Sequence, residues 1–306
     1  MPDFFRELFM NHSPHGPEWE NVRHFLKFGD AGEITPFYFK GKEYILLNRS
    51  AINGSLKPGE PDCGEIIDVE TNQPITRVMH NHYFIEAYTA NGRCYCFGAA
   101  MTPGKWNAHA IYVTSSDDLV NWTTPELVVK HDFYLYNTTA TYNGSEYILL
   151  YEHNDPKYPP FTYYFLKSKD LKNWERIPDA VFAKDHYAGG PAIYYMPEDR
   201  FYYLCWVREF TNPQTGALNY DTSIARSKDL INWEYGKRPV ISPDYSHRPD
   251  PVNHPDVYEI NASDAEFLET PEGVKAYWGG GNQQGVLDWI TGTYKGSLQE
   301  LFHKFF

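Results

Sequence analysis

One phrase occurs three times in this chain: Ser-Asp-Asp-Leu-Val-Asn-Trp at 116–122, Ser-Lys-Asp-Leu-Lys-Asn-Trp at 168–174 and Ser-Lys-Asp-Leu-Ile-Asn-Trp at 227–233. The copies lie roughly 50 to 60 residues apart, and a repeat of this kind indicates a fold that stacks one supersecondary unit. A period of this length suits the four-stranded blade of a β-propeller. We therefore expect a radially repeated, all-β fold.

Each copy of the phrase follows a run of alternating apolar residues, which is typical of a strand, and so should form the turn into the next strand. The Asp and Asn of the phrase can hydrogen-bond the turn backbone, and its Leu and Trp can pack beneath the blade. We interpret the phrase as a structural element.

A second pattern, an inner strand followed by a tight turn and an apolar, mostly aromatic strand, occurs five times. The copies span residues 34–47, 83–97, 139–151, 191–206 and 264–278. Two of the turns contain Asn-Gly, a strong hairpin signal. The sequence therefore predicts a five-bladed β-propeller with four-stranded antiparallel blades around a central funnel. The Pro-, Gly- and Asp-rich segments 51–76 and 237–258 are expected to be long loops.

The length of 306 residues suits a single radially repeated domain. We expect that domain to span 1–306, with an N-terminal lead at 1–29. Apolar residues recur at helical spacing near the end of the sequence, which predicts a helix at about 297–306 on the rim of the propeller.

Composition excludes several classes of partner. The net charge is −13, and no run of Lys or Arg could track a phosphate backbone or an acidic membrane. Charged residues interrupt the apolar stretch at 1–9, and the four cysteines form neither a disulfide framework nor a zinc motif. We expect a cytoplasmic protein without nucleic-acid or membrane partners. The sequence gives no indication of the oligomeric state.

The repeated unit resembles that of the five-bladed propeller glycoside hydrolases, to which glycoside hydrolase families 43, 32, 117 and 130 belong. The resemblance covers about residues 30–296 and implies a central funnel in which carboxylates from several blades act on a glycosidic bond. Family 43 enzymes carry an Asp before Pro on blade one, an Asp on a middle blade and Glu-Gly-Pro on blade four. This chain has Thr35, Asn137 and Gly189 at the corresponding places. Neighbouring acids would therefore have to take over the chemistry.

Glycoside hydrolysis needs a proton donor and a carboxylate that acts as base or nucleophile. Asp264 begins an inner strand between small residues, and Glu33 should share a strand face with Thr35. Either could be the base or nucleophile. His186 or Asp185, just before the blade-four strand, could be the acid, and family 117 is understood to use a histidine in this role. The alternative is that these four residues only fix turns, cap loops or face solvent.

Other polar and aromatic residues are candidates for sugar binding. Glu152 ends an apolar strand, with a salt bridge to an arginine as the alternative. His80 and His82 share a strand face, and we favour hydroxyl recognition over metal binding because no third ligand is near in the sequence. Trp106, Trp206 and Trp278 could stack on sugars or belong to the core. The substrate-binding candidates are His80, His82, Asn137, Glu152, Arg49, Arg208, Gln283, Gln284, Trp206 and Trp278. No cofactor or metal is expected.

The sequence thus predicts a glycosidase that removes one terminal sugar from a short oligosaccharide or glycoside. One alternative is a propeller that binds carbohydrate without cleaving it. Another is a phosphorylase similar to those of family 130, for which Arg49 and Arg208 would be the candidate phosphate ligands. The convergence of two acidic groups in one pocket would distinguish catalysis from simple binding.

Overall fold

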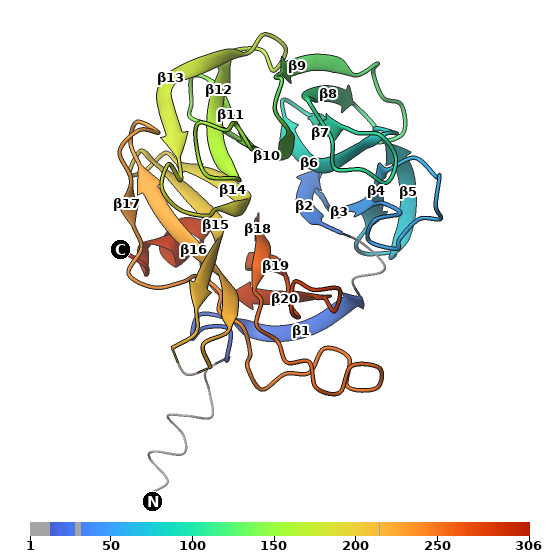
Figure 1. The fold of residues 1–306 in the computed structure, drawn as a ribbon. Coiled ribbons are helices and arrows are strands. Elements are labelled where there is room, and N and C mark those ends of the chain that lie inside the picture. The colour runs from blue at the N-terminus through green and yellow to red at the C-terminus, as the bar shows by residue number, and fades with distance from the viewer. Residues whose placement is uncertain (1–12, 28–31, 214) are drawn as a thin grey trace, which may run out of the picture.

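The strands form five four-stranded sheets arranged radially around a central axis (Figure 1). The computed structural model describes residues 13–27, 32–213 and 215–306. Every pair of neighbouring strands is antiparallel, and the first strand of blades 1 to 5 (β2, β6, β10, β14 and β18) lies nearest the axis. The five-bladed propeller predicted from the sequence is therefore confirmed.

The blades follow one another along the chain. Blade 1 comprises β2 (Ile34–Phe39), β3 (Lys42–Arg49), β4 (Cys63–Asp68) and β5 (Gln73–Val78). Blade 2 comprises β6 (His82–Ala90), β7 (Arg93–Ala100), β8 (Ala110–Ser116) and β9 (Glu126–Lys130). Blade 3 comprises β10 (Leu135–Tyr142), β11 (Tyr147–His153), β12 (Thr162–Ser168) and β13 (Glu175–Phe182). Blade 4 comprises β14 (Gly189–Met196), β15 (Phe201–Thr211), β16 (Leu218–Ser227) and β17 (Glu234–Tyr235). Blade 5 contains β18 (Ser263–Thr270), β19 (Gly273–Gly279), β20 (Asp288–Tyr294) and β1 (Glu20–Lys27).

Blade 5 joins two distant parts of the chain, because its outer strand β1 pairs with β20 (Figure 1). The sequence analysis placed residues 1–29 outside the propeller as a lead, so this strand was not foreseen. The expected C-terminal helix is present as α2 (Leu298–His303). Ser297 and Glu300 form a capping box at its start, and Leu298, Leu301 and Phe302 are buried in the core shared by blades 4 and 5.

The prediction of a long loop at 51–76 was wrong, because β4 and most of β5 lie within this segment. β4 carries acidic and glycine residues among its apolar ones, and β5 is mostly exposed, so neither shows the alternation of a half-buried strand. The second predicted loop, 237–258, contains no named strand, and the structure describes all of it.

The repeated phrase forms the turn between the third and fourth strands of blades 2, 3 and 4, as predicted. In the blade-3 copy, Asp170 Oδ1 accepts the backbone N–H groups of Lys172 and Asn173 at 2.9 and 2.8 Å. Leu171 is buried at a φ of 61°, and the ring of Trp174 packs against Phe97 of blade 2 at 5.7 Å. The other two copies repeat the Asp and Leu contacts. The phrase therefore forms a turn and fills the space between blades.

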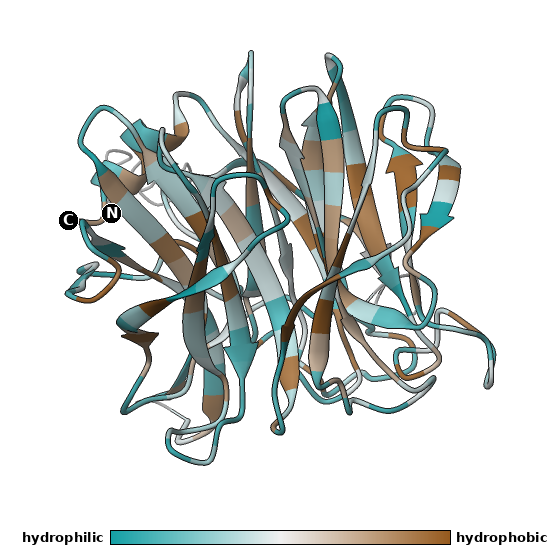
Figure 2. Cartoon of the chain, turned by 90° about the horizontal axis from the view of Figure 1, so that it is seen from above, coloured by the Kyte–Doolittle hydropathy of each residue, from teal (hydrophilic) through white to brown (hydrophobic). Residues whose placement is uncertain are grey.

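Apolar residues concentrate within the strands, and polar residues concentrate at the loops of both faces (Figure 2). Side chains also link the inner strands around the ring. Glu86 accepts the Ala140 N–H at 3.0 Å, and Thr139 accepts the Ile193 N–H at 3.2 Å. These bonds connect the middles of the inner strands of blades 2, 3 and 4. No helix in the described part of the chain has the length and apolarity needed to cross a bilayer.

Candidate active site

A pocket lies where the inner strands of all five blades begin. It is lined by Glu33, Ile34, Thr35, Phe84, Ile85, Glu86, Asn137, Thr138, Gly190, Pro191, Asp264 and Glu266. We call it the funnel pocket. Four of its lining side chains are carboxylic acids, so the pocket is acidic.

The strand geometry explains how the acids converge. Asp264 and Glu266 lie on β18, Glu86 lies on β6, and Glu33 immediately precedes β2. All four line the pocket. The inner strands of three blades therefore bring the four carboxylic acids together.

Backbone irregularities occur where three of these strands meet the pocket. The β18 register shifts between Ser263 and Glu266, and Asp264 has a φ of 51°. An equivalent shift surrounds Phe84 of β6, with a φ of 54°, and another surrounds Gly190 of β14. A left-handed conformation costs a non-glycine residue about 1–2 kcal/mol, and bulges of this kind redirect side chains next to active sites. The cost at Asp264 is consistent with a functional position.

Asp264 is held from two sides. The Ser263 hydroxyl donates to Asp264 Oδ2 at 2.5 Å and itself accepts from the amides of Asn261 and Gln283, each at 3.0 Å. On the other side, a Cβ atom at Gly190 would lie 2.2 Å from Asp264 Oδ1. Only glycine therefore allows this carboxylate its position against β14.

The carboxyl groups of the site have different protonation preferences. Burial raises the pKa of Asp264, and the Ser263 hydrogen bond opposes that rise. Burial and the Asp264 charge raise the pKa of Glu33 well above its usual range and that of Glu266 to about 8. Burial also raises the pKa of Glu152 to about 8. The Asp264 carboxylate thus accepts the Ser263 hydroxyl, while Glu266 and Glu152 hold protons at neutral pH.

Asn137 bridges two of these acids. In the amide orientation that satisfies its neighbours, its nitrogen donates to the two Glu33 carboxyl oxygens at 2.6 and 3.2 Å. Its amide oxygen then lies 3.4 Å from Glu152 Oε2. The same Glu152 oxygen accepts the Gly190 N–H at 3.2 Å. Glu152 is 3% exposed, so it lies behind the pocket wall and connects Asn137 of blade 3 to Gly190 of blade 4.

Aromatic rings form a continuous arc beside the pocket. The Trp106 ring contacts Phe84 at 5.6 Å, and Phe84 contacts Tyr136 at 5.7 Å. Tyr136 leads to Phe161 at 5.3 Å, which in turn contacts Tyr187 at 5.5 Å. Phe84 lines the pocket, and Trp106 is 51% exposed. We call these five residues the aromatic arc, and its exposed end offers a ring face to a ligand.

The structure brings several of the predicted site residues together. Glu33, Asn137 and Asp264 line the funnel pocket, and Glu152 contacts Asn137. Gln283 reaches the site through Ser263, whereas the adjacent Gln284 is exposed.

The predicted acid pair lies elsewhere. His186 is 2.8 Å from Asp185, and its ring packs near Phe182 and Trp206 in the cluster between blades 3 and 4. Neither residue of the pair lines the funnel pocket.

The other predicted binding residues also lie away from the pocket. Trp206 and Trp278 are 3% and 0% exposed and belong to separate hydrophobic clusters. His82 packs edge-on against Tyr112, and the adjacent His80 is exposed.

The two arginines are paired elsewhere: Arg49 with Glu65, and Arg208 with Asp221, each at 2.5 Å. The expected alternative, an ion pair between Glu152 and one of them, is not among the ion pairs of the described residues. No Lys or Arg of the described chain lines the pocket.

Sequence reasoning missed Glu266 as a pocket acid. A signal was available, because Glu266 follows Asp264 by two residues on a predicted strand, and in a regular strand the two would share a face. Trp106 was named as a residue that could stack on sugars, with a place in the hydrophobic core as the alternative.

Comparisons with known proteins add the fold relationship. No protein-family model matches the sequence, and no curated protein matches it either. Solved structures do match. One is the GH93 α-L-arabinofuranosidase of Fusarium graminearum with arabinobiose, at a TM-score of 0.62 and 14% identity, covering 92% of this chain and 100% of that one.

This chain has the fold of glycoside hydrolases. An exo-1,5-α-L-arabinanase from a bovine ruminal metagenomic library matches at a TM-score of 0.59 and 14% identity, over 88% of this chain and 94% of that one. The GH43 endo-arabinanase from Bacillus licheniformis matches at 0.56 and 12% identity, over 89% and 96%. The resemblance to the five-bladed propeller glycoside hydrolases is thus confirmed at the level of the fold.

Proposed function

We propose that this protein is a glycoside hydrolase whose active site is the funnel pocket. The observation that carries the proposal is that Asp264 and Glu33 line one pocket, where the Ser263 hydroxyl bonds Asp264 and the Asp264 charge adds to burial in raising the pKa of Glu33. Pairs of titratable groups whose environments separate their pKa values are the usual basis of acid and base assignments. The known functions of proteins that share the fold support the same class of reaction.

In the proposed mechanism, Asp264 is the base or nucleophile and Glu33 is the acid. The Ser263 hydroxyl stabilises the Asp264 carboxylate, and Glu33, kept protonated by burial and by the Asp264 charge, donates to the departing glycosidic oxygen. Glu266 and Glu152 are positioning residues, and burial keeps their carboxyl groups protonated at neutral pH because it raises both pKa values to about 8. Asn137 holds the Glu33 carboxyl group in place.

The substrate is a terminal sugar of a short oligosaccharide or glycoside. The pocket is ringed by the inner strands of all five blades, which favours entry of the end of a sugar chain and therefore exo action. Several carboxyl groups and no described cation in the lining favour a neutral sugar over an acidic one. The adjoining group would stack on Trp106 at the exposed end of the aromatic arc. Arabinofuranosides and xylosides are the first sugars to test, since proteins of this fold act on them.

The test is hydrolysis of a panel of α- and β-aryl glycosides by wild type, Asp264→Asn, Glu33→Gln and His186→Ala, with and without phosphate. We expect the first two variants to lose about 10²- to 10⁴-fold in kcat/KM. His186→Ala serves as the matched control outside the pocket and should stay within a few-fold of wild type, with no response to phosphate. A large loss in His186→Ala with an active Asp264→Asn would refute the assignment.

Two other outcomes would select the alternatives. Turnover that requires phosphate would indicate a phosphorylase. Absence of turnover across the panel, together with sugar binding by calorimetry, would indicate a carbohydrate-binding propeller.

We also propose a cytoplasmic location, which the four free, buried cysteines support because such thiols persist in reducing compartments. Cell fractionation with immunodetection tests it, and recovery from the medium or periplasm would contradict it.

A further inference from the structure

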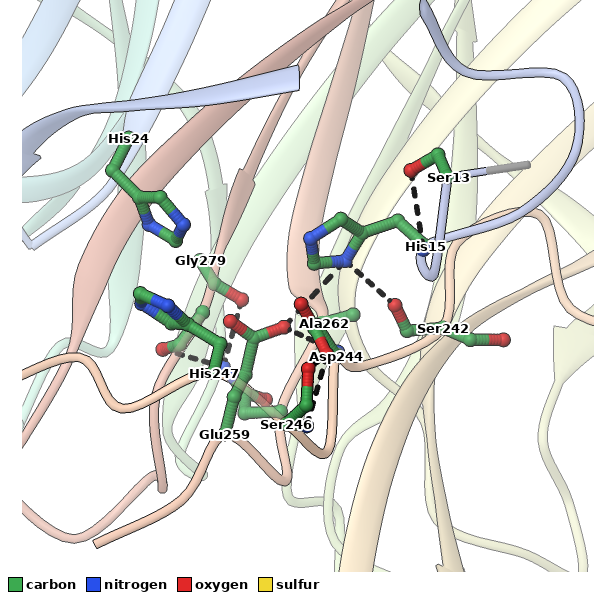
Figure 3. Close-up of polar contacts among 12 residues, drawn as sticks. Ser13, His15, His24, Ser242, Asp244, Ser246, His247, Glu259, Ala262 and Gly279 are labelled. Atoms are coloured by element: carbon green, nitrogen blue, oxygen red, sulfur yellow. Dashed lines mark hydrogen bonds and ion pairs between the residues drawn. The ribbon is translucent and has the colours of Figure 1, made fainter. Parts of the chain in front are cut away.

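A second cluster of ionisable side chains lies in blade 5 and takes no part in the funnel pocket (Figure 3). His24 comes from β1, while His247 and Glu259 come from the segment between β17 and β18. One donor atom from each of the three residues lies within 4.8 Å of the others. The two imidazole rings are stacked with centroids 3.9 Å apart. Three segments distant in the sequence therefore present nitrogen and oxygen donors to one point.

Asp288, at the start of β20, adds a second carboxylate. Its Oδ2 atom is 2.5 Å from His24 Nδ1 and 3.5 Å from His247 Nε2. A carboxylate that bonds one ring nitrogen of a histidine is the common way in which proteins orient a metal ligand.

Two oxygens of the cluster are buried without a hydrogen-bond partner. Glu259 is 0% exposed and its Oε2 atom has none, while Oε1 accepts the Asp244 N–H at 2.7 Å. Asp288 is 7% exposed and its Oδ1 atom also has none. Leaving such a group unsatisfied costs about 1–3 kcal/mol, and more if it is charged. Two unsatisfied carboxyl oxygens in one cluster therefore indicate that a cation belongs beside them.

Ordinary counter-ions do not meet this need. The ion pairs of the described residues join Glu259 and Asp288 only to histidines, His15 at 3.5 Å from Glu259 and His24 and His247 beside Asp288.

The space between these carboxylates is kept open by Gly280. A Cβ atom at this position would lie 2.8 Å from Asp288 Oδ1 and 3.1 Å from Glu259 Oε2, the same two unpartnered oxygens. Any larger residue would enter the gap that they face.

The donor set selects the kind of ion. Imidazole nitrogen with carboxylate oxygen suits Zn²⁺ and similar divalent transition metals, whereas Ca²⁺ prefers six or more oxygens. Donors around a tetrahedral Zn²⁺ ion lie about 3.4 Å apart, given Zn–N and Zn–O bonds of about 2.1 Å. The three side chains would therefore need to close by little more than 1 Å. The two carboxylates would balance the charge of the ion.

We propose that His24, His247 and Glu259 bind a divalent transition-metal ion, Zn²⁺ by donor type, and that Asp288 positions His24. The ion would join β1 to β20 and to the segment that leads into β18. Asn261 lies two residues after Glu259, and its amide donates to the Ser263 hydroxyl. That hydroxyl in turn donates to Asp264. The ion would thus stabilise the closure of the ring and the segment that places Asp264. Metal binding is independent of the proposed hydrolytic activity, so either proposal can fail alone.

The experiment uses the full chain, stripped with EDTA and titrated with Zn²⁺ and, separately, with Ca²⁺. We expect one Zn²⁺ per chain by calorimetry and elemental analysis, a rise in Tm with Zn²⁺, and little response to Ca²⁺. Co²⁺ in place of Zn²⁺ should give the intense visible absorption of a tetrahedral site.

Variants locate the ion. His247→Gln and Glu259→Gln should each lose the Zn²⁺-dependent rise in Tm, and Asp288→Asn should weaken binding about 10- to 100-fold. His303→Ala removes a comparable histidine–carboxylate pair, with Asp199 at 2.7 Å on the rim, and should bind Zn²⁺ like wild type. Circular dichroism of the metal-free variants checks that each is folded. No stoichiometric binding by wild type, or unchanged binding by folded His247→Gln and Glu259→Gln, would overturn the proposal.

Discussion

Replacement of the buried Glu152 by Gln should make the protein more stable than wild type, by an amount that grows as the pH rises. Burial raises the pKa of this carboxyl group from its usual 4.5 to about 8. Between these values the folded state keeps the proton while the unfolded state releases it, so the group lowers stability progressively through that window. At 1.36 kcal/mol per pKa unit, the three units from pH 5 to pH 8 would give about 4 kcal/mol, and the curvature of the titration near its two pKa values reduces this to about 3 to 4 kcal/mol. Gln has no proton to release and avoids this cost.

The assay is urea unfolding of wild type and Glu152→Gln at several pH values between 5 and 8. The difference in the free energy of unfolding should grow in favour of the variant by about 3 to 4 kcal/mol across this range. Glu126→Gln is the matched control, because Glu126 is exposed on β9, and should follow wild type at every pH. Parallel curves for wild type and Glu152→Gln would refute the reasoning, since they would mean that Glu152 titrates like a surface carboxyl group.

Three further outcomes are expected. Gly190→Ala should lower kcat/KM about 100-fold, because the new methyl group would displace Asp264. Gly92→Ala is the control: it has the same left-handed backbone but no atom within 4 Å of the new methyl group, so it should lose only about 1–2 kcal/mol of stability. Equal activity of the two variants would contradict this prediction. Trp106→Ala should raise KM several-fold with little change in kcat, and an unchanged KM would remove it from the substrate site. Leu171→Ala should cost about 2–5 kcal/mol by calorimetry or urea unfolding, and a loss below 1 kcal/mol would mean that the turn does not fill the space between blades.

The number and order of blades could be predicted because their signals are local. Alternating strands, Asn-Gly turns and the repeated phrase each lie within a few residues of one another. β1 could not be found in this way, because its pairing joins Glu20 to Thr293 and leaves no pattern in either segment alone. β4 and β5 were missed because their residues do not alternate between apolar and polar.

The candidate site was predicted in part. Glu33 and Asp264 were identified from their places at the start of inner strands, and both line the funnel pocket. His186 was chosen because of its position before β14, but the course of the loop places its ring near Trp206. The path of this loop depends on packing between blades, and no pattern in the sequence reports that packing. The cluster of His24, His247 and Glu259 was invisible for the same reason, since its members are separated by more than two hundred residues or by a long loop.

The pairing of β1 with β20 also bears on the order of events during synthesis. β1 leaves the ribosome before the strands of blades 1 to 4, and its partner β20 leaves after them, so four blades can form while β1 still has no partner. Closing so long a loop is entropically costly and slow. Asp264 belongs to this last blade, so a nascent chain would hold most of its propeller before it could hold a complete funnel pocket. The ring thus completes the funnel pocket only when the fold itself is complete.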